Sequence, residues 1–211
     1  MSRIDQMGDR NKMIIVTDNF YADPDLVRSF ALDATYSSGA QYNYPGYQSK
    51  KRLVNANALK ESFERILGKK IEYNIENFGS FRIMTKESGD IINVHVDATD
   101  WAGLVFLAPN APADAGMGIF RHRETGLMSP PSDKEARKKG FEDAQEYENL
   151  IVHRDKTNRE LWELVQDIEP VYNRLVLIRG NSLYHAPIRG FGDNSNNSRL
   201  THNFFFNEAM F

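Results

Sequence analysis

The sequence contains no cysteine. This absence excludes disulfide bonds, cysteine-ligated zinc sites, iron–sulfur clusters and a thiol nucleophile. Any metal bound by this chain must therefore be held by nitrogen and oxygen ligands, and only five histidines are present to supply imidazole nitrogen.

An excess of positive charge is also missing. The 26 lysines and arginines are outnumbered by 29 aspartates and glutamates, which gives a net charge of −3. Such a chain has no broad positive field with which to attract nucleic acid or anionic lipid. We therefore expect no nucleic-acid partner and no membrane partner, while the oligomeric state is not encoded in any pattern that we can identify.

Long hydrophobic runs are absent as well. The first apolar run, Met13 to Val16, is too short for the core of a signal peptide. The longest later run, Trp101 to Pro109, has about half the length of a membrane span. The sequence therefore predicts a soluble, cytoplasmic protein.

What the chain does have is enough apolar material for a core. It has 211 residues, of which 41% are hydrophobic, and it shows no internal repeat. We expect one domain that spans residues 1–211.

Two amphipathic helices are predicted before residue 70. Asp23 followed by Pro24 is typical of a helix start, because aspartate caps free amide groups and proline fits the first turn. A second helix is predicted over 56–67, where apolar residues recur at helical spacing and Gly68 is placed to end it. These helices, with a short strand at 13–17, are expected to cover a sheet.

After residue 70 the apolar period changes to two, which is typical of strands. Strands are predicted at Ile71–Ile75, Phe78–Thr85, Ile91–Asp97, Gly103–Ala108, Met117–Arg123, Arg174–Ile178, Ser182–His185 and Ser198–Phe206. Gly180 and Asn181 are a two-residue hairpin signal between two of these strands. The predicted fold is mainly β with flanking helices: a double-stranded β-helix, which is a jelly roll of the cupin-like kind.

A helical insertion is predicted over about 124–170. Two helix starts of the capping-box form occur there, at Ser132-x-x-Glu135 and Thr157-x-x-Glu160. The first leads into the charge-rich run 134–148, which we interpret as a solvated helix face rather than a partner site. The second is followed by residues at the spacing of a packed helix face, namely Leu161, Leu164, Val165 and Ile168.

The strand over 91–97 contains the first candidate metal ligands. Alternation sends Ile92, Val94 and Val96 to one face and Asn93, His95 and Asp97 to the opposite face, so an imidazole and a carboxylate point into the same space. The His-x-acid spacing also occurs at His122-x-Glu124 and His153-x-Asp155. In both of those an arginine stands between histidine and acid and can neutralise the carboxylate, which favours His95 and Asp97.

A catalytic metal needs a third protein ligand while other positions stay open. His185 is the expected third ligand, because it follows the turn at 180–181, where a partner strand can pass His95. Two histidines and one carboxylate on one side of an ion form the facial triad of non-haem Fe(II) oxygenases. His202 is a competing choice, but it alternates out of phase with Arg199 and Thr201.

Arg199 and Thr201 lie on one face of the last predicted strand. A buried guanidinium without a carboxylate partner would be too costly to keep. One explanation is a ligand: a guanidinium and a hydroxyl spaced by two suit one carboxylate of a diacid. The alternative is an internal salt bridge, and these two residues alone leave both explanations open.

At this point the sequence resembles the Fe(II)/2-oxoglutarate-dependent oxygenases, in particular small bacterial and phage members related to the prolyl-4-hydroxylase-like group. The resemblance rests on His95-x-Asp97, a distal His185 and Arg199-x-Thr201 in the order used by that family. It covers residues 13 to 206. The prolyl hydroxylases of this group have a lysine where Arg199 stands and a tyrosine with no counterpart in 81–85, so the resemblance does not extend to prolyl specificity.

The resemblance implies a set of roles. His95, Asp97 and His185 would hold Fe(II) as metal ligands and catalytic residues. 2-Oxoglutarate would chelate the metal, Arg199 and Thr201 would bind its distal carboxylate, and O2 would take the remaining position. The implied activity is a dioxygenase that hydroxylates a small molecule or an amino-acid or peptidyl substrate, with release of succinate and CO2.

Two other functions are compatible with the same residues. One is a non-catalytic jelly-roll module that binds metal only for structure, and this module would not turn over 2-oxoglutarate. The second is a cupin-like metalloenzyme in which Arg199 binds a substrate carboxylate directly. Its activity would persist without 2-oxoglutarate and without oxygen.

The substrate itself is not readable from the sequence. Three tyrosines, Tyr42, Tyr44 and Tyr47, could form a lid, although an aromatic turn packed on the barrel is the preferred interpretation. Arg121 and Arg123 could bind an anionic substrate or, more commonly, pair with nearby acids. Trp101 could line a pocket or belong to the core.

Overall fold

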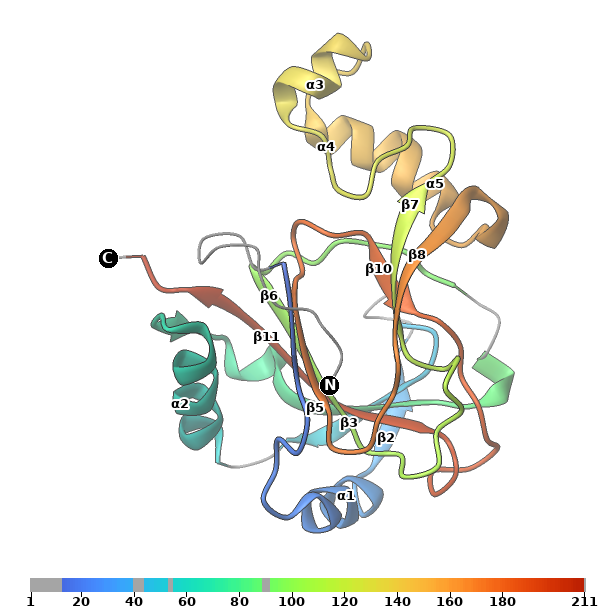
Figure 1. The fold of residues 1–211 in the computed structure, drawn as a ribbon. Coiled ribbons are helices and arrows are strands. Elements are labelled where there is room, and N and C mark those ends of the chain that lie inside the picture. Colours follow the sequence, from blue (N-terminus) through green and yellow to red (C-terminus); the bar gives the residue numbers. More distant parts are fainter. Residues whose placement is uncertain (1–12, 40–43, 53–54, 89–91, 211) are drawn as a thin grey trace.

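The computed structural model describes residues 13–39, 44–52, 55–88 and 92–210. Within them the chain is mainly β, and every strand pairing is antiparallel (Figure 1). The large sheet has the order β1-β9-β6-β11-β5-β3-β2, with β4 paired to β11 as its eighth strand. The smaller sheet has the order β10-β7-β8.

The strands of the large sheet are β1 (Ile14–Thr17), β2 (Tyr36–Ser38), β3 (Tyr47–Arg52), β4 (Ile71–Glu72), β5 (Phe78–Met84), β6 (Trp101–Phe106), β9 (Leu175–Arg179) and β11 (Arg199–Glu208). Those of the small sheet are β7 (Met117–His122), β8 (Trp162–Ile168) and β10 (His185–Pro187). Short 3₁₀ turns cover Ile75–Asn77, Lys86–Ser88 and Arg159–Leu161. The prediction of a mainly β fold with flanking helices is confirmed.

Helix α1 (Pro24–Leu32) begins where the sequence predicts, and helix α2 (Ala56–Leu67) both begins and ends where the sequence predicts. The carboxylate of Asp23 accepts a hydrogen bond from the Leu26 amide at the start of α1. Gly68 ends α2 with a φ of 67°, a conformation that glycine adopts without steric cost. Local signals are sufficient to predict these helix boundaries, because residues next to a helix terminus satisfy the backbone groups that are free there.

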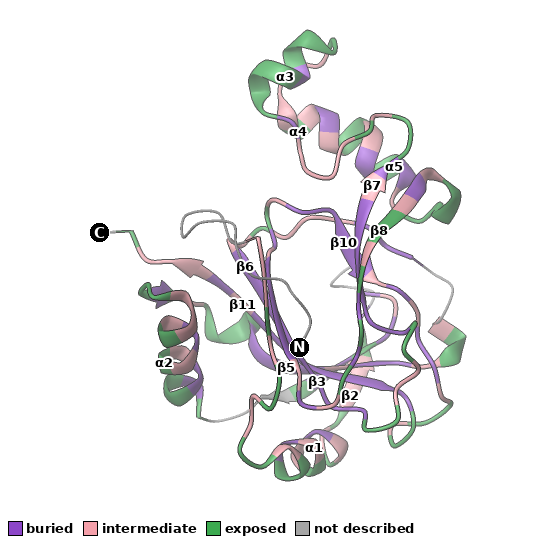
Figure 2. Cartoon of the chain, viewed as in Figure 1, coloured by how far each residue is buried: buried purple, intermediate pink, exposed green. Residues whose placement is uncertain are grey.

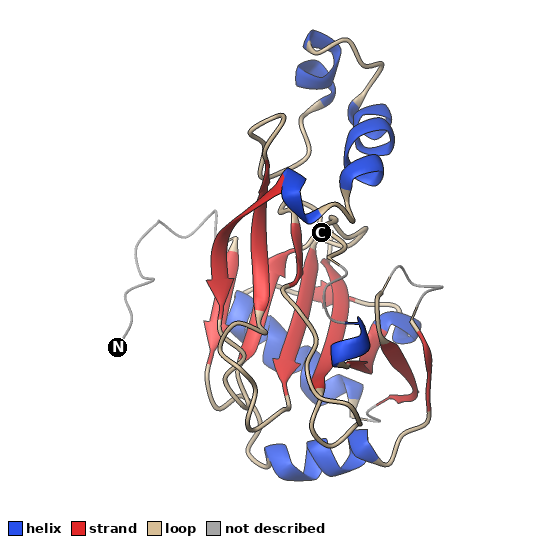
Figure 3. Ribbon diagram, turned by 90° about the vertical axis from the view of Figure 1, so that its right-hand side faces the viewer, coloured by secondary structure: helices blue, strands red, loops and turns tan. Residues whose placement is uncertain are grey.

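The large sheet is buried on both faces. Helices α1 and α2 lie on its outer face (Figure 2). The aromatic core there includes Phe63, whose complete burial is worth roughly 1.5–3 kcal/mol. On its inner face Leu104 and Val176 meet Met117 and Ile119 of the small sheet. The two sheets therefore face each other (Figure 3), and residues of both sheets line the pocket that contains the candidate site.

The insertion between β7 and β8 projects from one end of the two sheets (Figure 1). It contains α3 (Asp133–Lys138), α4 (Ala144–Tyr147), a π-helical turn (Glu148–Val152) and α5 (His153–Asp155). The predicted capping box is present, since Ser132 and Glu135 exchange hydrogen bonds. Much of α3 is exposed, as expected of a solvated charged face (Figure 2).

The helix predicted to begin at Thr157 is wrong. Asn158 caps a single 3₁₀ turn, and residues 162–168 then form β8. The helical spacing of Leu164 and Val165 misled the prediction, because both side chains are 40% or more exposed on a strand at the edge of its sheet. Pairing with β7 satisfies the backbone of this segment, and such tertiary pairing outweighs a short apolar period.

The hairpin predicted at Gly180 and Asn181 is also wrong, although the turn itself is present. The strand before it, β9, pairs with β1 and β6, whereas β10 after it pairs with β7. The turn therefore carries the chain from one sheet to the other. This crossing places His185 opposite the large sheet.

Candidate metal and anion site

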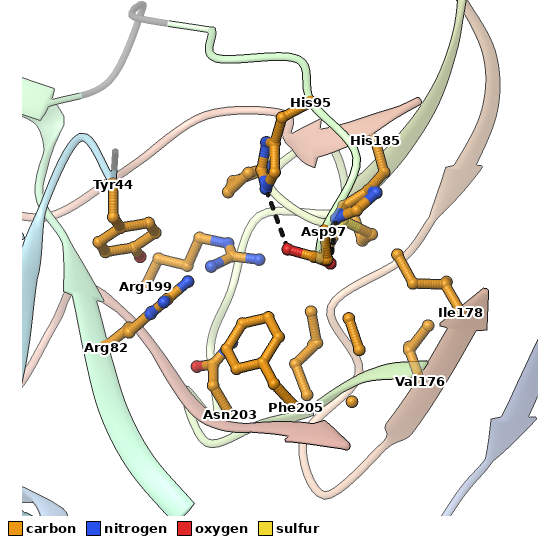
Figure 4. A pocket seen from close by; sticks show the side chains of 15 residues that line it. Tyr44, Arg82, His95, Asp97, Val176, Ile178, His185, Arg199, Asn203 and Phe205 are labelled. Carbon is orange, nitrogen blue, oxygen red and sulfur yellow. Dashed lines mark ion pairs between the residues drawn. The ribbon is translucent and has the colours of Figure 1, made fainter. Parts of the chain in front are cut away.

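His95, Asp97 and His185 meet at one end of a pocket between the two sheets (Figure 4). One ligand atom of each lies within 4.8 Å of the ligand atoms of the others. His185 is almost completely buried, whereas His95 retains a side-chain exposure of 35%. The open side of the cluster is therefore the His95 side.

His95 does not lie on a regular strand, contrary to the prediction for 91–97. In the described part, 92–97, it makes one isolated antiparallel bridge with His185. The two residues exchange both backbone hydrogen bonds, at 3.1 and 3.0 Å, and the side chains of such a pair share one face. The predicted alternation still holds, since Ile92 and Val94 are buried in the core beneath the insertion.

Backbone carbonyl groups set the orientation of both imidazole rings. The Nδ1 atom of His95 lies 2.8 Å from the carbonyl oxygen of Asn93, and that of His185 lies 2.8 Å from the carbonyl of Leu183. A carbonyl accepts only from a protonated nitrogen, so these contacts favour the tautomer with a free lone pair on Nε2. A hydrogen bond from the other ring nitrogen to a backbone carbonyl is typical of metal-binding histidines.

Asp97 lies between the two imidazoles. Its Oδ1 is 3.6 Å from His95 Nε2, and its Oδ2 is 3.1 Å from His185 Nε2. Burial favours the neutral carboxyl, but the charge of His185 prevails and holds the pKa of Asp97 well below its usual range. Burial likewise opposes protonation of His185, yet Asp97 raises the pKa of His185 above its usual value.

The donor set of this cluster fits a divalent metal. Asp97 Oδ2 is buried, and no group in the described parts of the chain donates a hydrogen bond of acceptable geometry to it. An orphaned carboxylate oxygen beside two imidazole Nε2 atoms is the arrangement that a cation would satisfy. Nitrogen and oxygen ligands in this proportion suit non-haem Fe(II).

Gly180 makes room for the carboxylate of Asp97. Its carbonyl accepts a hydrogen bond from the Asp97 amide at 2.8 Å, and a Cβ atom at Gly180 would lie 2.7 Å from Asp97 Oδ2. Such a contact is too short, so the carboxylate would have to move.

We therefore expect Gly180→Ala to weaken metal binding by about 10- to 100-fold, the range for a lost supporting contact. Gly68→Ala is the matched control: it introduces strain at a positive φ, costs about 1 kcal/mol of stability and leaves metal affinity unchanged. Titration of both variants with Fe(II) or Ni²⁺, together with thermal unfolding, measures this difference. Equal metal affinity in the two variants would contradict it.

Arg199 occupies a second region of the same pocket (Figure 4). It is 2% exposed, and its Nε and Nη2 atoms donate to the backbone carbonyls of Ala115 and Gly116 at 3.2 and 3.4 Å. Among the residues that the structure describes, no carboxylate pairs with it, so the internal salt bridge considered above is not observed there. Burial lowers the pKa of Arg199, as expected for a cation with only neutral partners.

Thr201 lies on the same face of β11 but does not line the pocket surface. Its hydroxyl donates a hydrogen bond to Asn203 Oδ1 at 2.7 Å. Two pocket residues with polar groups, Asn203 and Arg82, were not identified from the sequence, and Tyr44 was considered there only as part of a lid or an aromatic turn. Arg82 could have been found from the strand period, since it pairs with Thr201 across β5 and β11.

The second histidine cluster is an internal ion-pair network. His122 and Asp155 meet at 3.1 Å, and Glu124 lies close enough to complete a possible ligand set. Arg154 binds Asp155 and also contacts Glu124 at 3.1 Å, while the Nδ1 of His122 is 3.0 Å from the Thr125 hydroxyl. Both carboxylates are thus neutralised by Arg154. The sequence predicted this for Asp155, whereas for Glu124 it pointed to Arg123.

His202 lies on the opposite face of β11 from Arg199. It stacks against Phe81 in the outer core, and its Nδ1 is 2.7 Å from the Tyr21 hydroxyl. Burial lowers the pKa of His202 to about 3. His202 is therefore a neutral core residue, and His153 is exposed on α5.

The structure also shows where the other residues considered in the sequence analysis lie. Trp101 belongs to the outer core, where its indole donates to Glu208. Arg121 forms a surface ion pair with Glu163 at 3.1 Å. Tyr47 is 41% exposed and Tyr44 is buried in the pocket, so they do not form one cluster, and Tyr42 lies outside the described residues.

A family model matches residues 1–206. The chain belongs to DUF6445, a family of unknown function. No curated protein shows significant similarity to this DUF6445 sequence.

Comparison with solved structures identifies proteins whose fold is similar to that of this DUF6445 chain. An oxidoreductase of the 2OG-Fe(II) oxygenase family from Burkholderia pseudomallei matches with a TM-score of 0.54 and 13% identity over 97% of this chain and 92% of that chain. HygX from Streptomyces hygroscopicus, with nickel, 2-oxoglutarate and hygromycin B bound, matches with a TM-score of 0.52 and 11% identity over 94% and 84%. At these identities the likeness establishes the fold alone.

Across the described ranges, none of the helices is both long enough and apolar enough to traverse a lipid bilayer.

Proposed function

We propose that this protein is an Fe(II)- and 2-oxoglutarate-dependent dioxygenase. The observation that carries the proposal is the pairing of two features in one pocket: a His-Asp-His cluster at one end and the buried Arg199 without a described acidic partner elsewhere on its wall. A metal alone explains the first feature but not the second. A ligand that both chelates a metal and presents a distant carboxylate explains both.

The fold supports this proposal. We infer that the two facing sheets are the halves of a double-stranded β-helix and that residues 1–211 form a single domain with the helical insertion on one end. In such a fold the inner faces of the sheets hold the reacting groups. Here β11, β10 and the segment around His95 contribute them.

In the proposed enzyme the chain itself supplies ligands and orientation. The Nε2 atoms of His95 and His185 and a carboxylate oxygen of Asp97 would hold Fe(II). Bound Fe(II) and 2-oxoglutarate would supply the oxidising chemistry, in which a substrate R–H, O2 and 2-oxoglutarate become R–OH, succinate and CO2. The carbonyl contacts on both Nδ1 atoms would keep the imidazole rings aimed at the metal.

The rest of the pocket would position the co-substrate and exclude water. Arg199 would bind the distal carboxylate of 2-oxoglutarate, and Thr201 would assist if its hydroxyl turns from Asn203 toward the pocket. Apolar walls formed by Val176, Ile178 and Phe205 would keep the reacting centre dry. Asp97 would supply a carboxylate ligand to the metal, and a carboxylate in this position would favour oxygenation over halide binding.

For the substrate we propose a small molecule or an amino-acid or peptidyl group. HygX was solved with hygromycin B in its structure, an example of a small-molecule ligand on a similar fold. The exposed side of His95 is the face on which a substrate could reach the metal.

The test is metal-dependent turnover of 2-oxoglutarate. Protein loaded with Fe(II) under anaerobic conditions is supplied with 2-oxoglutarate and O2 alone and then with free amino acids and short peptides, and succinate is measured. We expect slow succinate release without substrate and faster release with a matching substrate.

Three controls separate the alternatives. Release of succinate should cease without metal, without O2 and in the Asp97→Ala variant. Metal binding with no 2-oxoglutarate turnover under any condition would favour a non-catalytic module. Substrate conversion that persists without 2-oxoglutarate and O2 would favour the cupin-like metalloenzyme.

A further inference from the structure

The helical insertion holds both histidine segments of the metal cluster from outside the pocket. Near its start the carbonyl of Met128 accepts a hydrogen bond from the Tyr184 amide at 2.9 Å, and near its end the carbonyl of Lys156 accepts one from the Val94 amide, also at 2.9 Å. Tyr184 and Val94 are the residues directly before the two histidines. The two segments pair with each other through a single isolated bridge rather than a ladder. Their relative position therefore depends in part on what packs behind them.

The side chains behind the histidines belong to the core beneath the insertion. Alternation along each segment points the histidines into the pocket and sends the neighbouring residues the opposite way. Tyr184 is completely buried in this core, where its ring makes a T-shaped contact with Trp162 at 5.3 Å between centroids. The hydroxyl of Tyr184 donates a hydrogen bond to Oε1 of Glu148. Tyr184 thus connects the chain at His185 to the insertion through its side chain as well as its backbone.

Glu148 is placed by an uncommon backbone conformation. It begins the π-helical turn between α4 and α5, and such turns are rare and occur frequently at functional sites. Burial raises the pKa of Glu148, and the hydrogen bond from Tyr184 opposes this shift, so burial of this carboxylate is unfavourable in itself. Apolar packing would stabilise such a core at least as well, but a hydrogen bond is directional and fixes geometry. The pair is thus better suited to hold a position than to add stability.

We propose that Tyr184 is a positioning residue for the metal site, whose hydrogen bond to Glu148 fixes the backbone at His185 and so keeps the imidazole of His185 beside Asp97. This inference rests on the metal site of the proposed function and extends it to the helical insertion, which supplies none of the proposed ligands. Tyr184 does not line the pocket, so it acts only through the residue that follows it.

The test is anaerobic titration of the metal-free protein with Co²⁺, together with the visible absorption of the Co²⁺-saturated protein, which reports the geometry of the ligands. Tyr184→Phe removes the hydroxyl and keeps the ring. We expect the dissociation constant for Co²⁺ to rise about 3- to 10-fold, less than the roughly 10- to 100-fold for a group bonded directly to a ligand, because Tyr184 acts through the backbone. The absorption bands at saturation should also shift, which a loss of stability alone would not cause.

Variants of Glu148 test the hydrogen bond itself. Glu148→Met removes the acceptor and should match Tyr184→Phe, whereas Glu148→Gln keeps a carbonyl acceptor and should bind Co²⁺ as the parent does. The double variant Tyr184→Phe/Glu148→Met should lose no more affinity than either single variant, since both changes remove the same contact. Additive losses, or equal losses in Glu148→Gln and Glu148→Met, would overturn the proposal.

Tyr172→Phe is the matched control, because the Tyr172 hydroxyl also donates to a carboxylate, that of Asp25, and neither residue lines the pocket. It should leave Co²⁺ affinity and absorption unchanged. Ser132→Ala removes the capping box of α3, so it should lower the melting temperature while Co²⁺ affinity stays unchanged. An unchanged affinity and spectrum in Tyr184→Phe, or an equal loss of affinity in Ser132→Ala, would indicate a contact that only stabilises the fold and would overturn the proposal.

This outcome is separate from that of the proposed function. If the parent binds Co²⁺ through the cluster of His95, Asp97 and His185 but never turns over 2-oxoglutarate, the proposed function fails, and the same titrations still decide the role of Tyr184. If the parent binds no Co²⁺, both the role of Tyr184 and the proposed function fail.

Discussion

Asp97→Ala is expected to abolish specific metal binding, with a loss in Fe(II) affinity of more than about 100-fold. Loss of a supporting contact alone costs about 10- to 100-fold, and removal of one of three ligands must cost more. The variant also leaves the two imidazoles without the carboxylate that separates their Nε2 atoms. Isothermal titration with Ni²⁺ or Co²⁺ under anaerobic conditions measures the loss without interference from oxidation.

Two histidine variants complete this experiment. His153→Ala changes an exposed residue and should bind metal as the parent does. His122→Ala breaks the buried contact with Asp155, so it should lower the melting temperature without a change in metal stoichiometry. If Asp97→Ala retained the metal and His122→Ala lost it, the metal would lie in the second histidine cluster, around His122 and Asp155. That result would refute the assignment.

Arg199→Met is expected to separate co-substrate binding from both metal binding and stability. Loss of a charged hydrogen-bond partner costs roughly 1.5–3 kcal/mol, which is a rise of about 10- to 150-fold in the dissociation constant for 2-oxoglutarate. Fe(II) affinity should be unchanged, because Arg199 is not a ligand. Thr201→Val should cost less, about 0.5–1.5 kcal/mol, because it removes a neutral group that already has a partner in Asn203.

The same Arg199 variant has an unusual expected effect on stability. Without ligand, the partners described for this buried guanidinium are neutral, and they include two backbone carbonyls. Replacing such a charge with an apolar side chain of similar length is often neutral or stabilising. The melting temperature without ligand should therefore stay equal or rise, whereas the increase caused by 2-oxoglutarate should disappear. A large drop in the ligand-free melting temperature would indicate a structural residue instead.

Much of the candidate site was predictable because its geometry is local. Alternation over 92–97 brings His95 and Asp97 to one side even though the segment is not a regular strand. The same alternation separates Arg199 from His202 on β11, and the structure places them on opposite faces. This alternation of side chains between the two sides depends only on an extended backbone, which is a local property of the chain.

Other features depended on contacts between distant segments. Residues 161–168 have a helical apolar period, but the open backbone edge of β7 made them a strand. The sequence favoured an aromatic turn for Tyr44. Its place beside Arg199 follows from the packing of its ring against Gly39, Gly46 and Arg82. No pattern within either segment contains this information.

The sequence by itself determined the start of α1, both ends of α2, the exclusion of cysteine chemistry and the sides on which His95, Asp97 and Arg199 lie, because capping and backbone alternation act within a few residues. Only the tertiary structure decided that the turn after β9 crosses between sheets, that His185 pairs with His95, and that Arg199 has no acidic partner within the described chain. These outcomes depend on which strands find each other, and strand pairing is selected by the burial of whole faces rather than by any single segment.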